Sequence, residues 1–219
     1  MMCARLGELA AELKCLEDAG IDSFHFDIMD GHFVPNLALT PDIMAALRPL
    51  TARPFLAHLM VDNPRDYIKS AAAAGTDVFV FHLEATHYPG RLIAEIADAG
   101  MTPGVAINPA TAVSGLEAVA GIAWILVMSV EPGFAGAEWI ANSPERVRMA
   151  RDLCGDDANL AVDGHINRST ARVLKEAGAN VFTCGTKSVF SGTHAVEAYR
   201  SEIQGLRQTL TTAIARLET

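Results

Sequence analysis

Several features are scarce in this sequence, and each scarcity excludes a class of protein. The longest apolar run, about residues 122–130, is too short to cross a bilayer, so we expect no membrane partner. Basic residues are outnumbered, 17 Lys and Arg against 26 Asp and Glu, and the net charge of −9 argues against a nucleic-acid partner. The four cysteines lack the spacing of a metal site and are typical of core residues in a protein from a reducing compartment. No signal-peptide pattern opens the chain. We therefore expect a cytoplasmic protein.

What the sequence has in abundance is apolar residues in a repeating order. Half of the 219 residues are hydrophobic, which is typical of a globular chain. The dipeptide Ala-Gly ends an amphipathic segment at residues 19–20, 74–75, 99–100 and 177–178, and an apolar run follows each time. Glycine suits the left-handed position after a helix. The order helix, glycine, strand predicts parallel βα units, and the lack of a linker predicts one domain spanning residues 1–219.

This pattern predicts seven strands and eight helices. The strands are expected near residues 22–29, 54–60, 77–83, 102–107, 124–130, 158–163 and 181–185. The helices are expected near residues 5–19, 41–48, 64–74, 89–99, 112–120, 144–154, 168–177 and 194–217. Thr40, Asn63 and Ser143 each precede a proline and are predicted to cap the helix that follows.

Seven strands are one fewer than a closed barrel of eight βα units needs, and the first predicted element is a helix. Either the missing strand lies upstream, or the barrel is open on one side, or the strands form an open doubly wound sheet. We favour an α/β fold of the (β/α)8 barrel type whose first strand is missing from this sequence.

The strand predicted near residues 22–29 carries the first candidate site residues. Side chains two positions apart share one face of a strand, so His25 and Asp27 lie side by side. An imidazole and a carboxylate in this arrangement can bind a divalent cation. The simpler interpretation is a buried His–Asp hydrogen bond, and only residues at later strand ends favour the metal.

Barrel enzymes place their active sites at the carboxyl ends of the strands, where this sequence has further polar residues. Buried imidazoles and carboxylates are costly unless they are paired or bind a cation. Two histidines and two aspartates could therefore form one metal site: His25, Asp27, His58 and Asp163. Nitrogen and oxygen donors suit Zn, Fe or Mn. A structural polar network is the alternative. His82 and Glu84 are weaker candidates, expected either to support the ligands from outside the site or to be satisfied core groups.

Glycine-rich turns follow two strands on the same rim. Residues 133–136 (Gly-Phe-Ala-Gly) and 185–186 (Gly-Thr) follow the sixth and eighth strands of the implied barrel. Such turns let backbone amides approach an anion, which favours a phosphorylated substrate, although each alone is equally an ordinary turn. Asp27 and Asp163 come from distant strands and can flank that substrate. One can remove a proton next to a carbonyl and the other return a proton to the opposite face.

These motifs resemble those of the ribulose-phosphate 3-epimerase family along essentially the whole chain. The matching segments are residues 25–36 (His-Phe-Asp-Ile-Met-Asp-Gly-His-Phe-Val-Pro-Asn), 58–60, 108–111, 127–134, 162–164 and 185–186. The resemblance implies a TIM barrel that uses one divalent cation (Zn, Fe, Mn or Co). It implies interconversion of D-ribulose 5-phosphate and D-xylulose 5-phosphate through an enediolate. It also implies a homo-oligomer, a dimer or a hexamer.

Carried over by position, the resemblance implies a role for each site residue. Asp27 and Asp163 are expected to be the catalytic acid/base pair, and the four residues of the metal site to be its ligands. Substrate contacts are expected from four segments: His58; Gly133, Phe134, Ala135 and Gly136; Asp163, Gly164 and His165; Gly185 and Thr186.

Three features differ from the usual pattern of the family. The opening strand with its substrate-contacting serine is missing, His165 stands where a glycine is usual, and segment 185–190 is one residue longer. His165 and the longer segment 185–190 resemble the allulose-6-phosphate 3-epimerases, which convert D-allulose 6-phosphate to fructose 6-phosphate. Residues 81–86 instead resemble the enzymes of the family that act on pentulose phosphates. A metal-dependent hydrolase and a non-catalytic truncated relative are the remaining alternatives.

Overall fold

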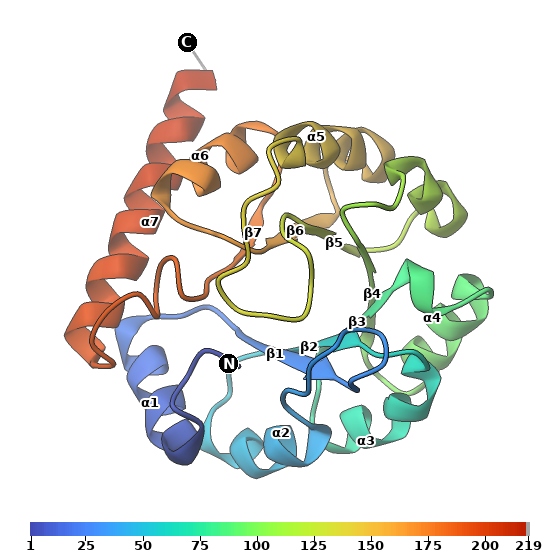
Figure 1. The fold of residues 1–219 in the computed structure, drawn as a ribbon, viewed down its shortest axis with the longest axis horizontal. Coiled ribbons are helices and arrows are strands. Elements are labelled where there is room, and N and C mark those ends of the chain that lie inside the picture. The colour runs from blue at the N-terminus through green and yellow to red at the C-terminus, as the bar shows by residue number, and fades with distance from the viewer. Residues whose placement is uncertain (218–219) are drawn as a thin grey trace.

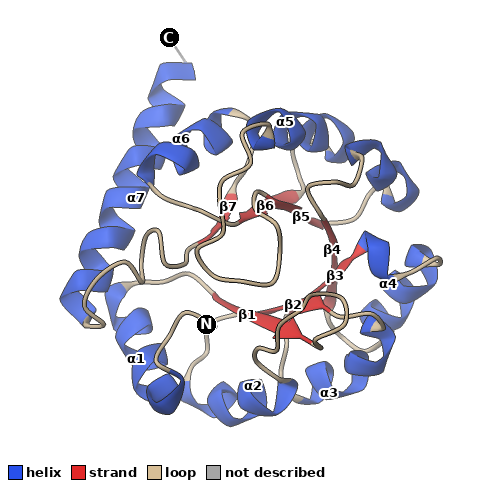
Figure 2. Ribbon diagram, in the orientation of Figure 1, coloured by secondary structure: helices blue, strands red, loops and turns tan. Residues whose placement is uncertain are grey.

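Seven parallel strands form one continuous sheet in the computed structural model, which describes residues 1–217. Each strand pairs with the next one along the chain, and the strands curl around a common centre inside a ring of helices (Figures 1 and 2). The strands are β1 (Phe24–Met29), β2 (Phe55–Met60), β3 (Val78–His82), β4 (Thr102–Ile107), β5 (Trp124–Met128), β6 (Asn159–Asp163) and β7 (Val181–Thr183).

Helices fill the connections between the strands, precede the first strand and follow the last. The α-helices are α1 (Leu9–Ala19), α2 (Pro41–Leu47), α3 (Ile68–Ala73), α4 (Pro89–Asp98), α5 (Ser143–Cys154), α6 (Arg168–Glu176) and α7 (Val196–Leu217). The 3-10 helices are η1 (Leu6–Glu8), η2 (Arg48–Leu50), η3 (Pro64–Tyr67), η4 (Leu83–Ala85) and η5 (Val113–Val119). None of the described helices combines the length and apolarity needed to cross a membrane.

The sheet curls into a barrel that has a seam. In the described part of the chain, β1 pairs with β2 and β7 pairs with β6, but β1 and β7 do not pair with each other. The seam lies where the first strand of an eight-stranded barrel would stand. The expected fold is therefore confirmed, with its first strand missing. A doubly wound sheet is excluded because the strand order never reverses.

Helices α1 and α7 pack side by side across the outside of this seam (Figure 1). The fully buried carboxylate of Glu12 joins them. It accepts a hydrogen bond from Arg5 Nε at 2.6 Å and from the hydroxyl of Tyr199, and it lies 3.0 Å from His194 Nδ1. Because a buried carboxylate is stable only when its oxygens are satisfied, these three partners make the contact specific. We call these four residues the α1–α7 clasp.

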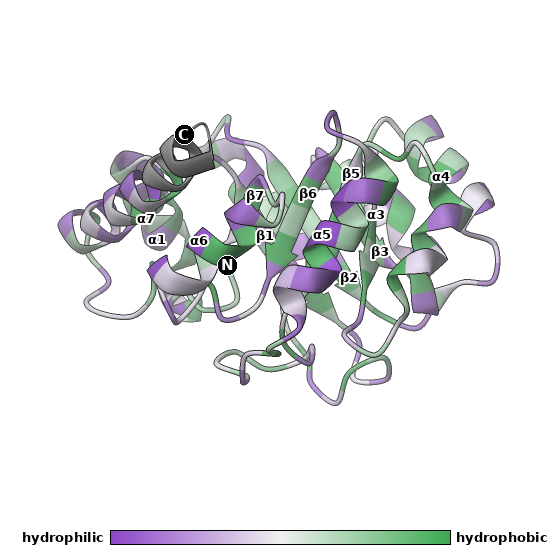
Figure 3. Cartoon of the chain, turned by 90° about the horizontal axis from the view of Figure 1, so that it is seen from above, coloured by the Kyte–Doolittle hydropathy of each residue, from purple (hydrophilic) through white to green (hydrophobic). Residues whose placement is uncertain are grey.

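Alternation along each strand separates two cores. In β2, Phe55, Ala57 and Leu59 pack toward the helices, whereas Leu56 packs inside the barrel with apolar residues of β3, β4, β5 and β6. The strands and the inward faces of the helices are accordingly hydrophobic, and polar residues line the outer faces of the helices (Figure 3). His58 follows Leu56 on the inner face, which places an imidazole inside the barrel.

Two details differ from the sequence-based predictions. The helix expected near residues 112–120 is the 3-10 helix η5. The predicted caps at Thr40, Asn63 and Ser143 are wrong, because no side chain of these residues caps its helix. Ser143 is the first residue of α5, and its hydroxyl donates to the carbonyl of Ile140 at 2.7 Å instead. A capping box occurs at α6, where the side chain of Asn167 accepts from two backbone amides.

Candidate metal centre and active site

The candidate site lies inside the barrel, at the carboxyl ends of β1, β2 and β6. His25 and Asp27 share the inward face of β1, and the β1–β2 register sets Asp27 directly opposite His58. Asp163 is the last residue of β6 and approaches from across the barrel. Residues that are 105 and more positions apart in the chain therefore meet because parallel strands end at the same edge.

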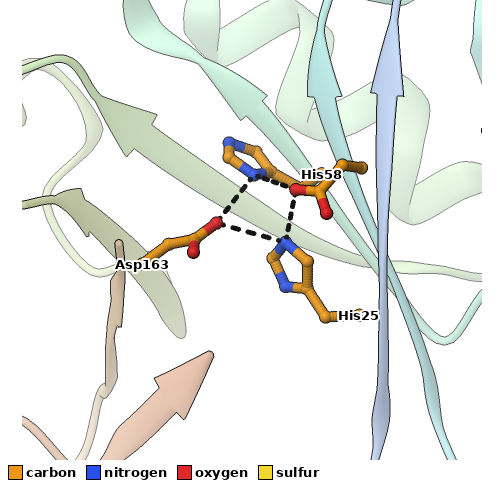
Figure 4. A group of neighbouring side chains, drawn as sticks. His25, His58 and Asp163 are labelled. Atoms are coloured by element: carbon orange, nitrogen blue, oxygen red, sulfur yellow. Dashed lines mark hydrogen bonds and ion pairs between the residues drawn. The ribbon is translucent and has the colours of Figure 1, made fainter. Parts of the chain in front are cut away.

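Four short distances connect these side chains (Figure 4). His25 Nε2 lies 3.1 Å from Asp27 Oδ1 and 3.4 Å from Asp163 Oδ2. His58 Nδ1 lies 3.5 Å from each of the same two oxygens. Each imidazole thus presents one nitrogen to both carboxylates, and the four atoms lie within 4.8 Å of one another.

This arrangement fits a divalent cation. Nitrogen and oxygen ligands about 2.1 Å from a tetrahedral ion are separated by about 3.4 Å, which is close to the distances between these side chains. His58 Nδ1 is buried and has no hydrogen-bond partner among the described residues, as expected of a nitrogen whose partner is a cation. Zn, Fe, Mn and Co all accept this donor set.

Opposite charges shift the pKa values inside the cluster. Burial opposes the charged form of Asp27, but His25 and then His58 outweigh burial and hold the pKa of Asp27 far below its usual range. Burial also opposes a charged His58, yet Asp163 and Asp27 outweigh it and raise the pKa of His58 to about 9. The negative charge of the pair of carboxylates therefore dominates the site, which suits a cation.

Side chains that sequence reasoning missed, or left as weak candidates, support both imidazoles. Thr183 Oγ1 lies 3.4 Å from His25 Nδ1 and reaches it across the seam from β7. His82, a weak candidate from the sequence, is not part of the group formed with Asp27 and Asp163, but its Nε2 lies 2.9 Å from His58 Nε2. Both residues follow the pattern of polar residues at strand ends, since Thr183 is the last residue of β7 and His82 the last residue of β3.

A cavity of about 1260 Å³, counting its open mouth, lies beside the cluster. It is lined by nine of the expected substrate-contacting residues: Gly133, Phe134, Ala135, Gly136, Asp163, Gly164, His165, Gly185 and Thr186. His58 is fully buried and lies outside this lining. Met29, Met60 and Met128 give the cavity an apolar wall, which limits water near the cluster.

The turn after β6 has an unusual backbone. Gly164 has a φ of +110°, and a Cβ built there would lie 2.5 Å from Val130 Cγ2, so only glycine fits. His165 follows with a φ of +52°, in the left-handed region that few non-glycine residues adopt. Its Nδ1 lies 3.1 Å from the carbonyl oxygen of Ala137, which ties this turn to the 133–137 loop.

The 133–136 turn is also held by the segment after β1. Asn36 Nδ2 donates to the carbonyl oxygen of Gly133 at 2.7 Å, and a Cβ on Gly133 would lie 3.1 Å from the Cβ of Val34. The strand pattern does not predict this contact, because the two residues are 97 positions apart in loops. The contact fixes one wall of the cavity mouth.

The fold and the site together define a class, a (β/α)-barrel enzyme with a candidate metal centre at the carboxyl ends of its strands. The sequence model described as the Ribulose-phosphate 3 epimerase family matches residues 1–190. The chain belongs to this family. The expected enzyme class, an isomerase of the epimerase type acting on carbohydrates, is confirmed by the names of its relatives.

Relatives match over almost the whole chain. A ribulose-phosphate 3-epimerase of Bacillus subtilis is 38% identical over 210 residues, which cover 94% of this chain and 96% of the relative. A ribulose-phosphate 3-epimerase of Oryza sativa, named as the cytoplasmic isoform, is 37% identical over 213 residues, which cover 94% of this chain and 92% of the relative. Among solved structures, the tryptophan synthase α-subunit of Pyrococcus furiosus has a TM-score of 0.71 at 15% identity, with 92% of each chain covered. At that identity the likeness shows the fold alone.

Proposed function

We propose that this protein is a metal-dependent ketose-phosphate 3-epimerase that interconverts D-ribulose 5-phosphate and D-xylulose 5-phosphate. One observation carries the proposal: Asp27 and Asp163 approach the same two imidazoles from opposite sides of the barrel, next to the cavity. A reaction that removes a proton from one face of a carbon and returns it to the other needs two such groups.

The two aspartates carry the proton transfers. One carboxylate takes the proton from C3. The C3–H electron pair then forms the C2–C3 double bond of an enediolate, and the π pair of the C2 carbonyl moves onto its oxygen. The other aspartate, protonated, then donates to the opposite face of C3, and the roles reverse in the back reaction. A divalent cation held by His25, Asp27, His58 and Asp163 would stabilise the negative charge that develops on the substrate oxygens.

The glycine turns position the phosphate in this proposal. Residues 133–136, 164–165 and 185–186 line one side of the cavity, and the backbone amides of such turns can hold an anion without basic side chains. A phosphate anchored there would place the sugar carbons over the aspartates, and the methionine wall would keep water away from the enediolate.

Proton exchange tests this function directly. The metal-loaded protein is mixed in D2O with ribulose 5-phosphate and, separately, with allulose 6-phosphate, and C3 is followed by NMR. We expect deuterium at C3 and the appearance of the xylulose epimer. No exchange with either sugar by well-folded, metal-loaded protein would reject the proposal, and turnover without exchange at C3 would reject the two-aspartate mechanism.

A hexulose phosphate is the second candidate substrate. The observation that favours it is His165, which places a side chain on the cavity wall at a turn where the family usually has glycine. Preferential exchange of allulose 6-phosphate would establish this alternative. Release of inorganic phosphate would instead indicate a hydrolase, and sugar-phosphate stabilisation without turnover a non-catalytic relative.

The proposal includes a single domain over residues 1–219, a cytoplasmic location and a homo-oligomer, either dimer or hexamer. A relative named as a cytoplasmic isoform supports the location. Light scattering after size exclusion measures the oligomeric state, and a monomer at working concentration would contradict that part.

A further inference from the structure

A line of polar contacts runs outward from His58, away from the candidate metal. His58 Nε2 lies 2.9 Å from His82 Nε2, and the two rings stack with their centroids 5.0 Å apart. His82 Nδ1 lies 3.4 Å from Glu84 Oε2. Both histidines are fully buried, so water does not satisfy these nitrogens. The line therefore consists of side chains that face one another, and the contact of His82 Nδ1 with Glu84 falls outside hydrogen-bond geometry.

The contact between the two imidazoles requires one shared hydrogen. Two ring nitrogens at 2.9 Å repel each other if both present lone pairs, and they clash if both carry hydrogens. One ring is therefore the donor and the other the acceptor. The carboxylate beyond His82 decides which ring donates.

Glu84 is held as an ionised carboxylate. Its Oε1 accepts the backbone N–H of Asn108 at 2.7 Å and the hydroxyl of Thr111. Arg146 in turn donates to the carbonyl oxygens of Asn108 and Thr111 at 2.8 Å each, which fixes the loop that supplies these donors. Glu84 Oε2 is thereby aimed at His82 as an acceptor.

Unless a cation takes its lone pair, a ring nitrogen that faces an ionised carboxylate carries a hydrogen. His82 therefore has its hydrogen on Nδ1, and its Nε2 accepts. His58 must then donate from Nε2, so that its Nδ1, which faces Asp27 and Asp163, is the nitrogen left to bind a cation. A cation that replaces the hydrogen on His58 Nδ1 lets this lone pair and the carboxylate oxygens face one another stably.

We propose that His82 and Glu84 are positioning residues that fix the tautomer and ring orientation of His58 for metal binding. The proposal rests on the metal-dependent function proposed above. Outer partners of this kind orient ligating histidines and raise their basicity, and their loss typically weakens metal binding about 10–100-fold. Neither residue contacts the substrate cavity, since both lie outside its lining.

Cobalt binding tests this role without using turnover. The wild type, His82→Phe, His82→Gln and Glu84→Gln are titrated with Co²⁺, and both the affinity and the visible spectrum are measured. His82→Phe keeps a flat ring in the stack but removes the acceptor, so we expect affinity to fall about 10–100-fold and the spectrum to change. His82→Gln offers an amide oxygen to His58 Nε2 and should recover affinity to within a few-fold.

Glu84→Gln separates the charge from the loop contacts. The glutamine keeps an oxygen for Asn108 and Thr111 but loses the charge that fixes the tautomer of His82, so its Co²⁺ affinity should fall between those of the wild type and His82→Phe. His87→Phe is the matched control, because it makes the same chemical change in a histidine outside the cavity lining. It should bind Co²⁺ like the wild type.

Apo-protein melting temperatures distinguish positioning from packing. A packing role predicts that His82→Phe and His82→Gln lower them equally and leave the cobalt spectrum unchanged, and that result would overturn the proposal. Wild-type affinity and spectrum in His82→Phe would also overturn it while the proposed function stands. Failure of the wild type to bind any cation would reject the metal-dependent function and this inference together.

Discussion

Asp163 is the residue on which the proposed chemistry can be tested most directly. Asp163→Asn keeps the size of the side chain but cannot take up a proton and is a weaker ligand. We expect C3 exchange and turnover to fall by about 10²–10⁴-fold, with weaker metal binding. Asp156→Asn, an exposed change of the same kind, should leave both unchanged. Wild-type turnover in Asp163→Asn would remove this residue from the mechanism.

Gly164 allows a second test at the residue scale. Gly164→Ala would force a Cβ to within 2.5 Å of Val130 Cγ2 in a left-handed backbone, so we expect a loss of about 2–4 kcal/mol in the free energy of unfolding. Gly100→Ala is the control, because its φ is +85° and no atom lies within 4 Å of the added carbon. Gly100→Ala should lower the free energy of unfolding by about 1 kcal/mol, and urea unfolding measures both variants. Equal losses would show that the contact with Val130 relaxes freely.

At this scale the sequence predicts residue types better than contacts. His25, Asp27, His58 and Asp163 could be selected because each is a polar residue within or at the end of an apolar strand. The contact between His58 and His82 could not be predicted, because the β2–β3 register and the orientation of the rings do not follow from the strand pattern. The unusual φ of His165 was equally hidden, since nothing local requires a non-glycine residue there.

The pairing of helices α1 and α7 gives a prediction at the scale of elements. Burial opposes the charge on Glu12, but the hydroxyl of Tyr199, Arg5 and His194 outweigh it and lower the pKa of Glu12. Tyr199→Phe removes one of these donors, so we expect a loss of about 1–3 kcal/mol in the free energy of unfolding at neutral pH. Urea unfolding measures it, and Tyr88→Phe, an exposed change, should have no effect.

The same variant has a defined pH dependence. A carboxylate whose folded pKa is depressed stabilises the protein above its usual pKa of 4.5, and this contribution is lost as the pH falls below that value. The difference between wild type and Tyr199→Phe should therefore shrink between pH 5 and pH 3. A difference that grows toward low pH would contradict the assignment of charge to Glu12.

The predicted elements match the structure closely because glycine marks their boundaries. Gly20 and Gly178 have positive φ after α1 and α6, as the Ala-Gly pattern requires. The capping predictions fail for a different reason, since a residue type that can cap also bonds to other groups. Ser143 bonds back to Ile140 and Asn63 to Asp66, whereas Asn167, the observed cap, precedes no proline.

Metal removal gives a prediction for the molecule as a whole. A cation at 100 times its dissociation constant stabilises the folded state by about 2.7 kcal/mol. For a chain of this size, removal by a chelator should lower the melting temperature by about 5–10 °C. In His25→Gln the chelator should lower the melting temperature much less. Sodium chloride at the same ionic strength as the chelator should not lower it in the wild type. An unchanged melting temperature in the wild type would contradict a bound cation.

The barrel could be predicted for the whole molecule, but the way its seam is covered could not. Counting strands shows that one is missing, since each βα unit leaves a local pattern. The clasp between Arg5, Glu12, His194 and Tyr199 leaves no such pattern. Its partners lie up to 187 positions apart, and a buried glutamate looks like any other helical glutamate in sequence.

The seam also sets an order of folding. Each strand from β1 to β7 contacts mainly its neighbour in the chain, so the sheet can grow from any adjacent pair by closing short loops, as repeat proteins do. Closing the seam, where α1 meets α7 and Thr183 meets His25, brings distant parts of the chain together at a large cost in loop-closure entropy. We therefore expect the molecule to assemble first as a curved ribbon and to become a ring in a final, slower step. That step depends on one buried carboxylate finding its three partners.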